Sequence, residues 1–100
     1  MANDSGLNDP GLLIMISLAS GAKHGHAMLL DIEQFAGVRL GPGTLYGAIS
    51  RLETDSLVEA LPIDGRRRPY RLTPTGRDSL DRQLGSLRKT VETGVAKTSA

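Results

Sequence analysis

Four arginines crowd into one six-residue stretch of the chain: Arg66, Arg67, Arg68 and Arg71. A guanidinium is always charged and donates several hydrogen bonds, so such a cluster suits phosphate groups. The cluster is local, because the whole chain has a formal net charge of only +1 at pH 7. A basic cluster on a nearly neutral protein is typical of a nucleic-acid contact, although a solvated surface segment can have the same composition.

Two histidines invite a second chemistry, a metal site. His24 and His26 are separated by one residue, but the chain has no cysteine and no acidic pair beside them to complete a ligand set. A histidine that caps a helix or touches a phosphate explains them more simply. No nucleophile paired with a base, phosphate-binding loop or pair of acids in a cleft can be recognised either. The sequence therefore predicts no catalytic residue, no metal, no cofactor and no enzyme.

Size and composition indicate what kind of domain must position the arginines. One hundred residues suit a single domain, and 39% hydrophobic with 23% charged residues is ordinary for a soluble globular protein. The aromatic residues are Phe35, Tyr46 and Tyr70, so the core must be aliphatic. No apolar run is long enough to cross a bilayer, and the N-terminus does not resemble a signal peptide. A cytoplasmic protein without membrane contact is expected.

Two helices are predicted in the first part of the chain, after a flexible N-terminus over residues 1–8. Asp9-Pro10 supplies an N-cap and a first helical residue for a helix that is apolar almost all round. A second helix should cover residues 25–36, because apolar residues recur there at intervals of three and four. Its predicted buried face consists of Met28, Ile32, Phe35 and Ala36.

A third helix opens at Gly41-Pro42, after a short turn. Its outer face is small, polar and nearly free of acid, unlike most solvent-facing helices. A short-linked helix pair whose second member has such a face matches a helix-turn-helix, in which that member enters the DNA major groove. The residues predicted to contact DNA from this helix are Thr44, Tyr46, Gly47, Ser50 and Arg51.

Three of these residues also have a structural interpretation. Tyr46 can instead pack under the helix, and Thr44 can instead solvate its first turn. Arg51 can instead pair with Asp55, four residues later on the same helix. The sequence leaves these alternatives open.

Two short extended segments are predicted on either side of the arginine cluster, over residues 58–62 and 69–72. Between them Asp64-Gly65 is a hairpin signal, so the arginines should lie at a hairpin tip. Pro69 cannot donate a ladder hydrogen bond, so its strand is expected at a sheet edge or with a bulge. The tip residues predicted to contact the DNA backbone or minor groove are Arg66, Arg67 and Arg68.

A long last helix is predicted over residues 74–95, capped by Thr73, with a flexible tail over 96–100. Leucine and valine recur along it at intervals of four, three and four, which is the seam of a two-helix contact. The seam covers barely two heptads, so it would need help from another element, such as the first helix. The residues of this predicted dimerisation seam are Leu80, Leu84, Leu87 and Val91.

A series of short motifs between residues 12 and 80 accompanies these elements: Lys23-His24-Gly25, Pro42-Gly43-Thr44-Leu45-Tyr46, Arg51-Leu52-Glu53, Leu57-Val58, Arg66-Arg67-Arg68-Pro69-Tyr70 and Leu72-Thr73-Pro74-Thr75-Gly76-Arg77. In this order they resemble the N-terminal domain of the PadR family of winged-helix regulators. The resemblance implies a dimeric regulator, usually a repressor, that binds an inverted repeat near a promoter and dimerises through its last helix. The single short C-terminal helix resembles the smaller branch of the family. Some relatives release DNA on binding phenolic acids or flat hydrophobic drugs, which implies a small hydrophobic or aromatic effector. The chain has no Trp, so a stacking drug pocket is not expected.

The chain departs from the family pattern at several positions. Gly47 stands where the family usually has proline, and His26 and Pro69 stand where tyrosine is common. The segment Thr54-Asp55-Ser56 lacks the glycine that usually precedes Leu57. We expect these differences to affect base preference and wing shape and to leave the fold intact.

The sequence thus predicts a mainly α protein with a small β-hairpin, in which a winged helix-turn-helix over residues 9–73 precedes a dimerisation helix over 74–95. The predicted function is sequence-specific binding of double-stranded DNA as a homodimer, in a transcriptional regulator that acts as a repressor. The alternative is a winged-helix module that docks to another protein, or an adaptor, without strong DNA binding. That alternative predicts an acidic or apolar third-helix face and an uncharged wing.

Overall fold

The computed structural model describes residues 8–99 of the chain. The flexible segment expected over residues 1–8 therefore lies, apart from Asn8, outside the described residues. The elements follow in the order α1 (Pro10–Ala19), β1 (Lys23–His24), α2 (Gly25–Ala36), α3 (Pro42–Thr54), β2 (Val58–Ala60), β3 (Pro69–Leu72) and α4 (Pro74–Thr98). The predicted fold class, mainly α with a small β element, is confirmed.

Local sequence signals account for where the helices begin and end. A carboxylate oxygen of Asp9 accepts a 2.9 Å hydrogen bond from the amide of Leu12, and the hydroxyl of Thr73 accepts one of 2.9 Å from the amide of Gly76. Helix α2 ends at Gly37, whose φ of 68° is a left-handed conformation that glycine adopts without strain. The predicted helix over residues 25–36 is confirmed at both ends.

Helix α1 lies at the centre of the fold, which is why it is apolar almost all round. It packs against α2, α3, α4 and β3. The core that these elements enclose is aliphatic, as expected, and its buried members are Leu12, Leu13, Ile14, Met15, Leu18, Met28, Ile32, Leu45, Ala48, Ile49, Leu52, Val58 and Leu80.

Phe35 does not belong to this core, so the prediction for that residue is wrong. Its side chain is 44% exposed, whereas Met28 and Ile32 are completely buried. Residues four apart on a helix lie on the same face, and the face of α2 that carries Met28 and Ile32 packs against α1. Phe35 falls beside that face, and its ring borders an open apolar cleft instead of the interior.

The sheet has three antiparallel strands in the order β1–β3–β2. Because β3 is the central strand, the expectation that Pro69 marks an edge or a bulge is wrong. Pro69 is the first residue of β3, where a missing N–H is tolerated, and its carbonyl accepts a 2.8 Å hydrogen bond from the amide of Leu61. The sequence does not predict β1, because two residues show no periodicity; β1 pairs His24 with Pro69.

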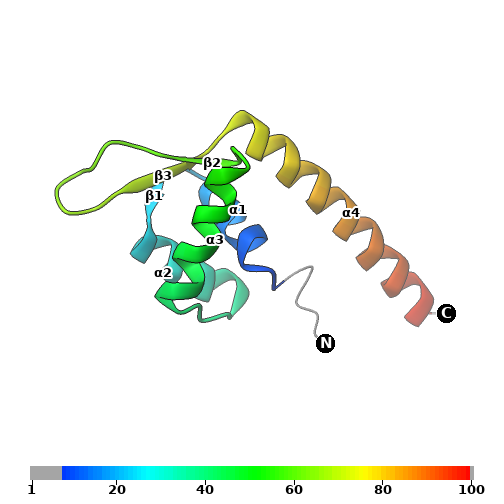
Figure 1. Cartoon of the computed structure of the whole chain (residues 1–100). Coiled ribbons are helices and arrows are strands. Elements are labelled where there is room, and N and C mark those ends of the chain that lie inside the picture. The colour runs from blue at the N-terminus through cyan, green and yellow to red at the C-terminus, as the bar shows by residue number, and fades with distance from the viewer. Residues whose placement is uncertain (1–7, 100) are drawn as a thin grey trace.

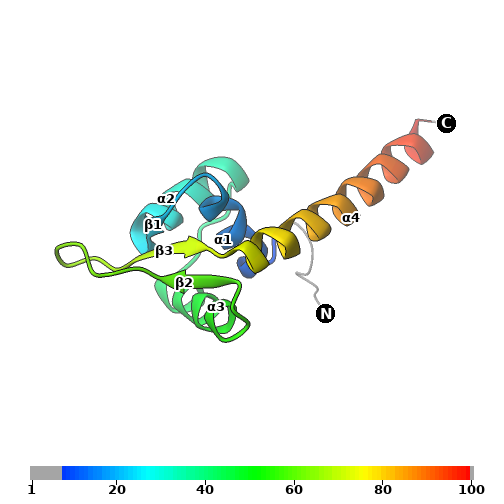
Figure 2. The same cartoon turned by 90° about the horizontal axis from the view of Figure 1, so that it is seen from above.

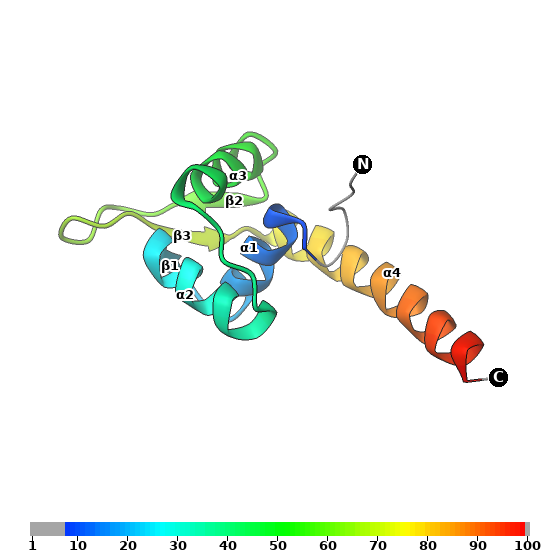
Figure 3. The same cartoon turned by 90° about the horizontal axis from the view of Figure 1, so that it is seen from below.

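The wing, defined here as residues 61–68 between β2 and β3, extends from one side of the body and α4 from the opposite side (Figures 1 and 2). The molecule is accordingly elongated, with extents of 55 × 26 × 25 Å. Seen from below, α2 and α3 lie on either side of β3, and the wing reaches beyond both (Figure 3).

Helix α4 is longer than predicted. It continues to Thr98, past the expected end at residue 95, because the amide of Ser99 still bonds to the carbonyl of Val95 at 3.1 Å. The hydroxyls of Thr98 and Ser99 bond to the same carbonyl, at 3.1 and 2.8 Å. Within residues 8–99, no helix is both long enough and apolar enough to cross a membrane.

Candidate nucleic-acid interface

Helix α3 separates its residues into a buried side and a solvent side. Leu45, Ala48, Ile49 and Leu52 are buried against the rest of the domain. The predicted contact residues lie on the other side, where Thr44, Tyr46, Ser50 and Arg51 are exposed and Gly47 is half-buried. The helix is therefore anchored by one face and exposes the other to solvent.

Tyr46 is partly packed and partly exposed, so a DNA contact by this residue stays a prediction. Its side chain is 49% exposed, yet its hydroxyl lies directly against Gly25 at the start of α2, since a Cβ built on Gly25 would stand 2.2 Å from that oxygen. Glycine at this position is thus what allows the ring to lean onto α2. The ring packs along one edge and remains open to solvent along the other.

Arg51 folds back along α3 rather than reaching toward Asp55. Its Nη1 atom would lie 3.8 Å from a Cβ at Gly47, one turn earlier on the helix. The ion pairs between described residues are Arg39–Glu33 and Arg71–Glu59, and neither includes Arg51. The guanidinium therefore lies on the solvent face of α3, beside the small residue that leaves room for it.

The wing closes in a tight turn with arginine at its tip. The amide of Asp64 bonds to the carbonyl of Arg67 at 2.8 Å, and the amide of Arg67 bonds back to the carbonyl of Asp64 at 3.0 Å. Gly65 has a φ of 65° at the first central position, as a type II′ hairpin turn requires. Arg66 occupies the second central position and is exposed.

The arginines of the cluster have different surroundings. Arg71 pairs with Glu59 across β2 and β3, at the base of the wing. Arg68 donates a 2.8 Å hydrogen bond to the carbonyl of Leu61 on the opposite arm of the wing. The charge of Arg71 is therefore partly neutralised, whereas Arg68 stiffens the wing and keeps its charge.

Arg67 turns toward the start of α2. Its Nη1 atom lies 3.0 Å from Nε2 of His24, although the two residues are 43 positions apart in sequence. The other ring nitrogen of His24, Nδ1, accepts a 3.3 Å hydrogen bond from the amide of Ala27 and so caps α2. The interpretation of a histidine that caps a helix is confirmed for His24. Within residues 8–99, no group of three His, Cys, Asp or Glu side chains is placed to hold a metal ion.

Strand β1 holds His24 in place for this contact. The ammonium of the preceding residue, Lys23, donates hydrogen bonds to the carbonyl of Ser17 and, at 3.0 Å, to the hydroxyl of Ser20. The hydroxyl of Ser17 in turn donates a 2.7 Å hydrogen bond to Asp31 of α2. The network ties β1 to the end of α1 and to α2.

A cleft joins α2, α3 and the wing, and we call it the basic cleft. It has a volume of about 260 Å³ and is lined by His24, Gly25, His26, Tyr46, Arg66, Arg67 and Arg68. The structure thus brings Tyr46 and the three tip arginines together, whereas Thr44, Gly47, Ser50 and Arg51 lie outside the cleft on α3. The sequence does not predict Gly25 as part of this site, although the Lys23-His24-Gly25 motif contains it, whereas it does predict a capping or phosphate-contacting role for the histidines.

Tyr70, on β3, is partly buried and packs against the hydrophobic core. Partial burial raises the pKa of its phenol, the nearby Glu53 and Tyr46 raise it further, and Arg68 opposes them. The phenol therefore stays uncharged over the physiological range, and it adds no negative charge near Arg68.

A second surface runs along α4. Leu80 is 2% exposed, Leu84 and Leu87 pack at the edge of the core, and Val91 and Val95 are 50% and 59% exposed. The predicted seam is therefore continuous, but its outer end packs against no other element among residues 8–99. Val95 extends the seam by one more interval of four, a signal that the sequence already contained.

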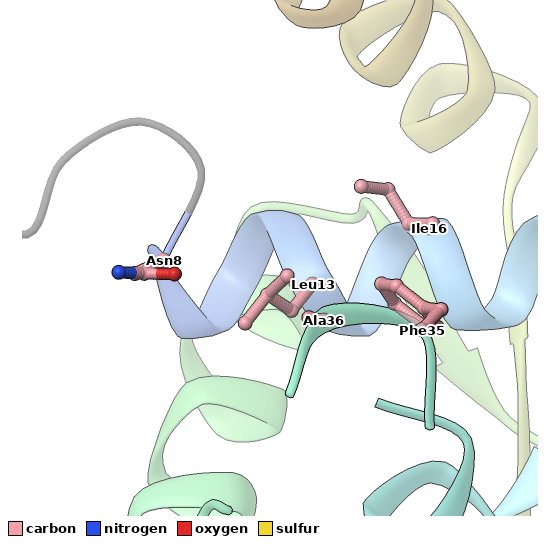
Figure 4. A pocket seen from close by; sticks show the side chains of 5 residues that line it. All are labelled: Asn8, Leu13, Ile16, Phe35 and Ala36. Atoms are coloured by element: carbon pink, nitrogen blue, oxygen red, sulfur yellow. The ribbon is translucent and has the colours of Figure 1, made fainter. Parts of the chain in front are cut away.

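An apolar cleft of about 330 Å³ lies between α1 and the end of α2. Figure 4 shows that Leu13 and Ile16 reach it from α1, Phe35 and Ala36 from the end of α2, and Asn8 from the segment before α1. Phe35 is the exposed apolar residue of this lining, and the cleft is a further apolar surface with no covering element among the described residues.

Comparison with known proteins places these features in a family. Residues 13–82 match the family described as "Transcriptional regulator PadR-like family". An uncharacterized 37.1 kDa protein in transposon TN4556 of Streptomyces fradiae is 50% identical over 80 residues, which are 80% of this chain. The chain spans only 23% of the length of that relative.

Two further proteins are similar over nearly their whole length. The transcriptional regulator Rv3488 of Mycobacterium tuberculosis is 38% identical over 94 residues, covering 88% of this chain and 87% of that protein. The crystal structure of a PadR family transcription regulator from Clostridium difficile has a TM-score of 0.78 at 21% identity, covering 91% of this chain and 98% of that chain. The structural likeness shows the fold, and it agrees with the winged helix described above.

Proposed function

Because this chain belongs to the PadR-like family of transcriptional regulators, we propose that it is a cytoplasmic repressor that binds an inverted repeat in duplex DNA as a homodimer. The family is one of regulators and not of enzymes. In this proposal residues 9–73 form the DNA-binding unit, and α4 pairs the two chains.

The observation that carries the proposal is that α3 and the wing border one basic cleft. Tyr46 of α3 and the tip arginines line it together. A helix in the major groove and a wing on the flanking backbone would therefore contact neighbouring parts of the same duplex. Because the inner face of α3 is buried against the domain, the orientation of α3 relative to the wing would be fixed.

The outer face of α3 supplies the proposed contacts in the groove. Arg51 has the side chain best suited to the edge of a guanine, and Gly47 beside it lets the helix come close to the bases. Thr44 and Ser50 offer hydroxyls to bases or phosphates. Tyr46, at the rim of the basic cleft, is placed for the backbone next to the groove.

The homodimer is proposed from two apolar surfaces that residues 8–99 of one chain leave uncovered. The outer part of α4 exposes Val91 and Val95, and the apolar cleft exposes Phe35. If two α4 helices pair along the seam, each can bury its outer end against the other chain. Such a dimer would present two copies of α3 about 34 Å apart, one turn of B-DNA. A small hydrophobic or aromatic effector, if the protein responds to one, would have its site at the apolar cleft.

Fluorescence anisotropy tests the proposal, with a labelled duplex from the DNA upstream of the gene, a scrambled duplex and a range of salt concentrations. We expect tighter binding to the upstream duplex and a steep fall of affinity with salt. Replacing Arg66, Arg67 and Arg68 with Ala should weaken binding to both duplexes and flatten the salt dependence by about one unit of slope for each phosphate that the protein no longer neutralises.

A matched control removes the same charge elsewhere. Ala at Arg82, Lys89 and Lys97, all exposed on α4, should leave affinity and slope close to those of the wild type. Failure of the wild-type protein to bind either duplex at low salt would contradict the proposal and favour a module that docks to another protein.

A further inference from the structure

The basic cleft contains two hydrogen-bond donors that face each other. Nδ1 of His24 accepts from the amide of Ala27, one of the first amides of α2, which have no partner within the helix. A neutral imidazole carries one proton, so this cap places the proton on Nε2. Nε2 nevertheless lies 3.0 Å from Nη1 of Arg67, which can only donate.

Two donors at this distance cannot satisfy each other. An anionic oxygen beside both could accept from the imidazole and from the guanidinium together, and charge-assisted bonds of this kind are the strong ones. The lining of the cleft favours such an oxygen, because it contains three arginines and no carboxylate. Glu53 of α3 and Glu59 of β2 are not among the lining residues.

We infer that His24 and Arg67 together hold one phosphate oxygen of the DNA backbone, and that this phosphate locks the wing onto α2. The inference rests on the proposed function and names the chemical group that the basic cleft binds. Duplex DNA is the source of the phosphate because the cleft lies between α3 and the wing, where a groove-bound helix brings the adjacent backbone. His24 is therefore a binding residue as well as a helix cap.

A double-mutant cycle tests this pairing. His24→Asn keeps an acceptor for the amide of Ala27, because asparagine is a good N-cap, but it removes the Nε2 donor. Arg67→Ala removes the second donor, and the double variant removes both. Arg82→Ala is the control for the loss of one positive charge, since Arg82 is exposed on α4. Binding is measured by anisotropy on one duplex over a range of salt concentrations.

We expect Arg67→Ala to lower affinity by about tenfold, because a hydrogen bond to a charged phosphate is lost. The slope of affinity against salt should fall by about one unit, because one phosphate is no longer neutralised. His24→Asn should lower affinity by at least about threefold, and the double variant should bind no more weakly than Arg67→Ala, because both side chains hold the same phosphate. Arg82→Ala should bind as the wild type does.

Several outcomes would overturn the inference. One is a double variant whose loss equals the product of the two single losses; another is a His24→Asn variant that binds as tightly as the wild type. A third is a combination of two results: inorganic phosphate stabilises the DNA-free wild type over chloride at equal ionic strength but not the double variant, and yet the double variant binds DNA as tightly as the wild type. That combination would assign the cleft to a free phosphate. If His24→Asn lowers the melting temperature, His24→Ser, a second capping residue, replaces it in the cycle.

The two proposals fail in different ways. Wild-type protein that binds no duplex at low salt contradicts the proposed function. If the wild-type protein binds with a steep salt dependence and both His24→Asn and Arg67→Ala bind equally well, only the inference that His24 and Arg67 hold a phosphate is contradicted.

Discussion

The hydroxyl of Tyr46 rests on the backbone of Gly25, so closely that a Cβ at Gly25 would stand 2.2 Å from the oxygen and 2.7 Å from the ring carbon that bears it. The contact joins the start of α2 to the outer face of α3. It also sets the rim of the basic cleft, since both residues line it. The position of a predicted DNA-contact residue thus depends on the absence of a side chain 21 positions earlier in the sequence.

Gly25→Ala should therefore impair DNA binding. The new methyl group must push the ring of Tyr46 outward, because the phenol is the movable partner. We expect affinity to fall by about tenfold, the size of one hydrogen bond to a charged phosphate. In a Tyr46→Ala background the same change at Gly25 should have little further effect on affinity measured by anisotropy. Equal losses from Gly25→Ala in both backgrounds would contradict this coupling.

Val91→Glu should convert the proposed dimer to monomers. Val91 is 50% exposed in a single chain, so the charge disturbs the interface without entering the core. Leu84→Glu is a poorer test, because Leu84 packs against the core of its own chain. Sedimentation velocity measures the outcome, and Thr93→Glu, on the opposite side of α4, is the control that should remain dimeric. A Val91→Glu protein that is still a dimer would place the interface elsewhere.

Gly76→Ala should destabilise the fold. A Cβ at Gly76 would lie 2.0 Å from the carbonyl oxygen of Leu57 and 2.8 Å from a methyl of Leu72. A backbone oxygen cannot move aside as a flexible side chain can, so we expect a loss of about 3 kcal/mol in the free energy of unfolding.

Gly85→Ala on the same helix provides the matched control for Gly76. The space around Gly85 is open, and alanine is the better helix former by about 1 kcal/mol. Urea titrations of the two variants should therefore shift in opposite directions. If both variants lose the same free energy of unfolding, the loss is caused by alanine in this helix and not by the contact with Leu57.

Ser56→Gly should stabilise the protein. Ser56 is the one residue other than glycine with positive φ, 61°, among residues 8–99. This left-handed conformation costs a residue with a side chain about 1 kcal/mol, and glycine relieves it. Thermal unfolding should show a gain of that size, whereas Asp55→Gly, where φ is −88°, should show none. A gain in both variants would mean that the strain at Ser56 is not its cause.

Alkaline pH should weaken the fold partly through Tyr70. Its pKa is raised in the folded protein above the ordinary value of 10.0, first by burial and then by Glu53 and Tyr46. The neutral phenol therefore contributes stability that is complete below the ordinary pKa and is lost as the pH rises through the folded-state pKa. Tyr70→Phe should lose less stability than the wild type between neutral and strongly alkaline pH in urea titrations. Parallel pH profiles for the two proteins would contradict the assignment.

The sequence determines the helices because their signals are local. The proline-opened starts of α1, α3 and α4, and the glycine after α2, act within one helical turn, so each can be recognised without knowing the fold. The Asp64-Gly65 turn is local in the same way and predicts the wing. The order of these elements, and the motifs that resemble the family, follow from the chain itself.

Only the tertiary structure decides which distant residues share a site. Strand β1 exists because β3 lies beside it, since two residues carry no pattern of their own. The wrong prediction for Phe35 has the same cause: periodicity identifies an apolar face, but packing against α1 selects which line of that face is covered. The contacts of His24 with Arg67 and of Gly25 with Tyr46 join segments far apart in sequence, and such contacts depend on how the helices and the wing pack together in three dimensions.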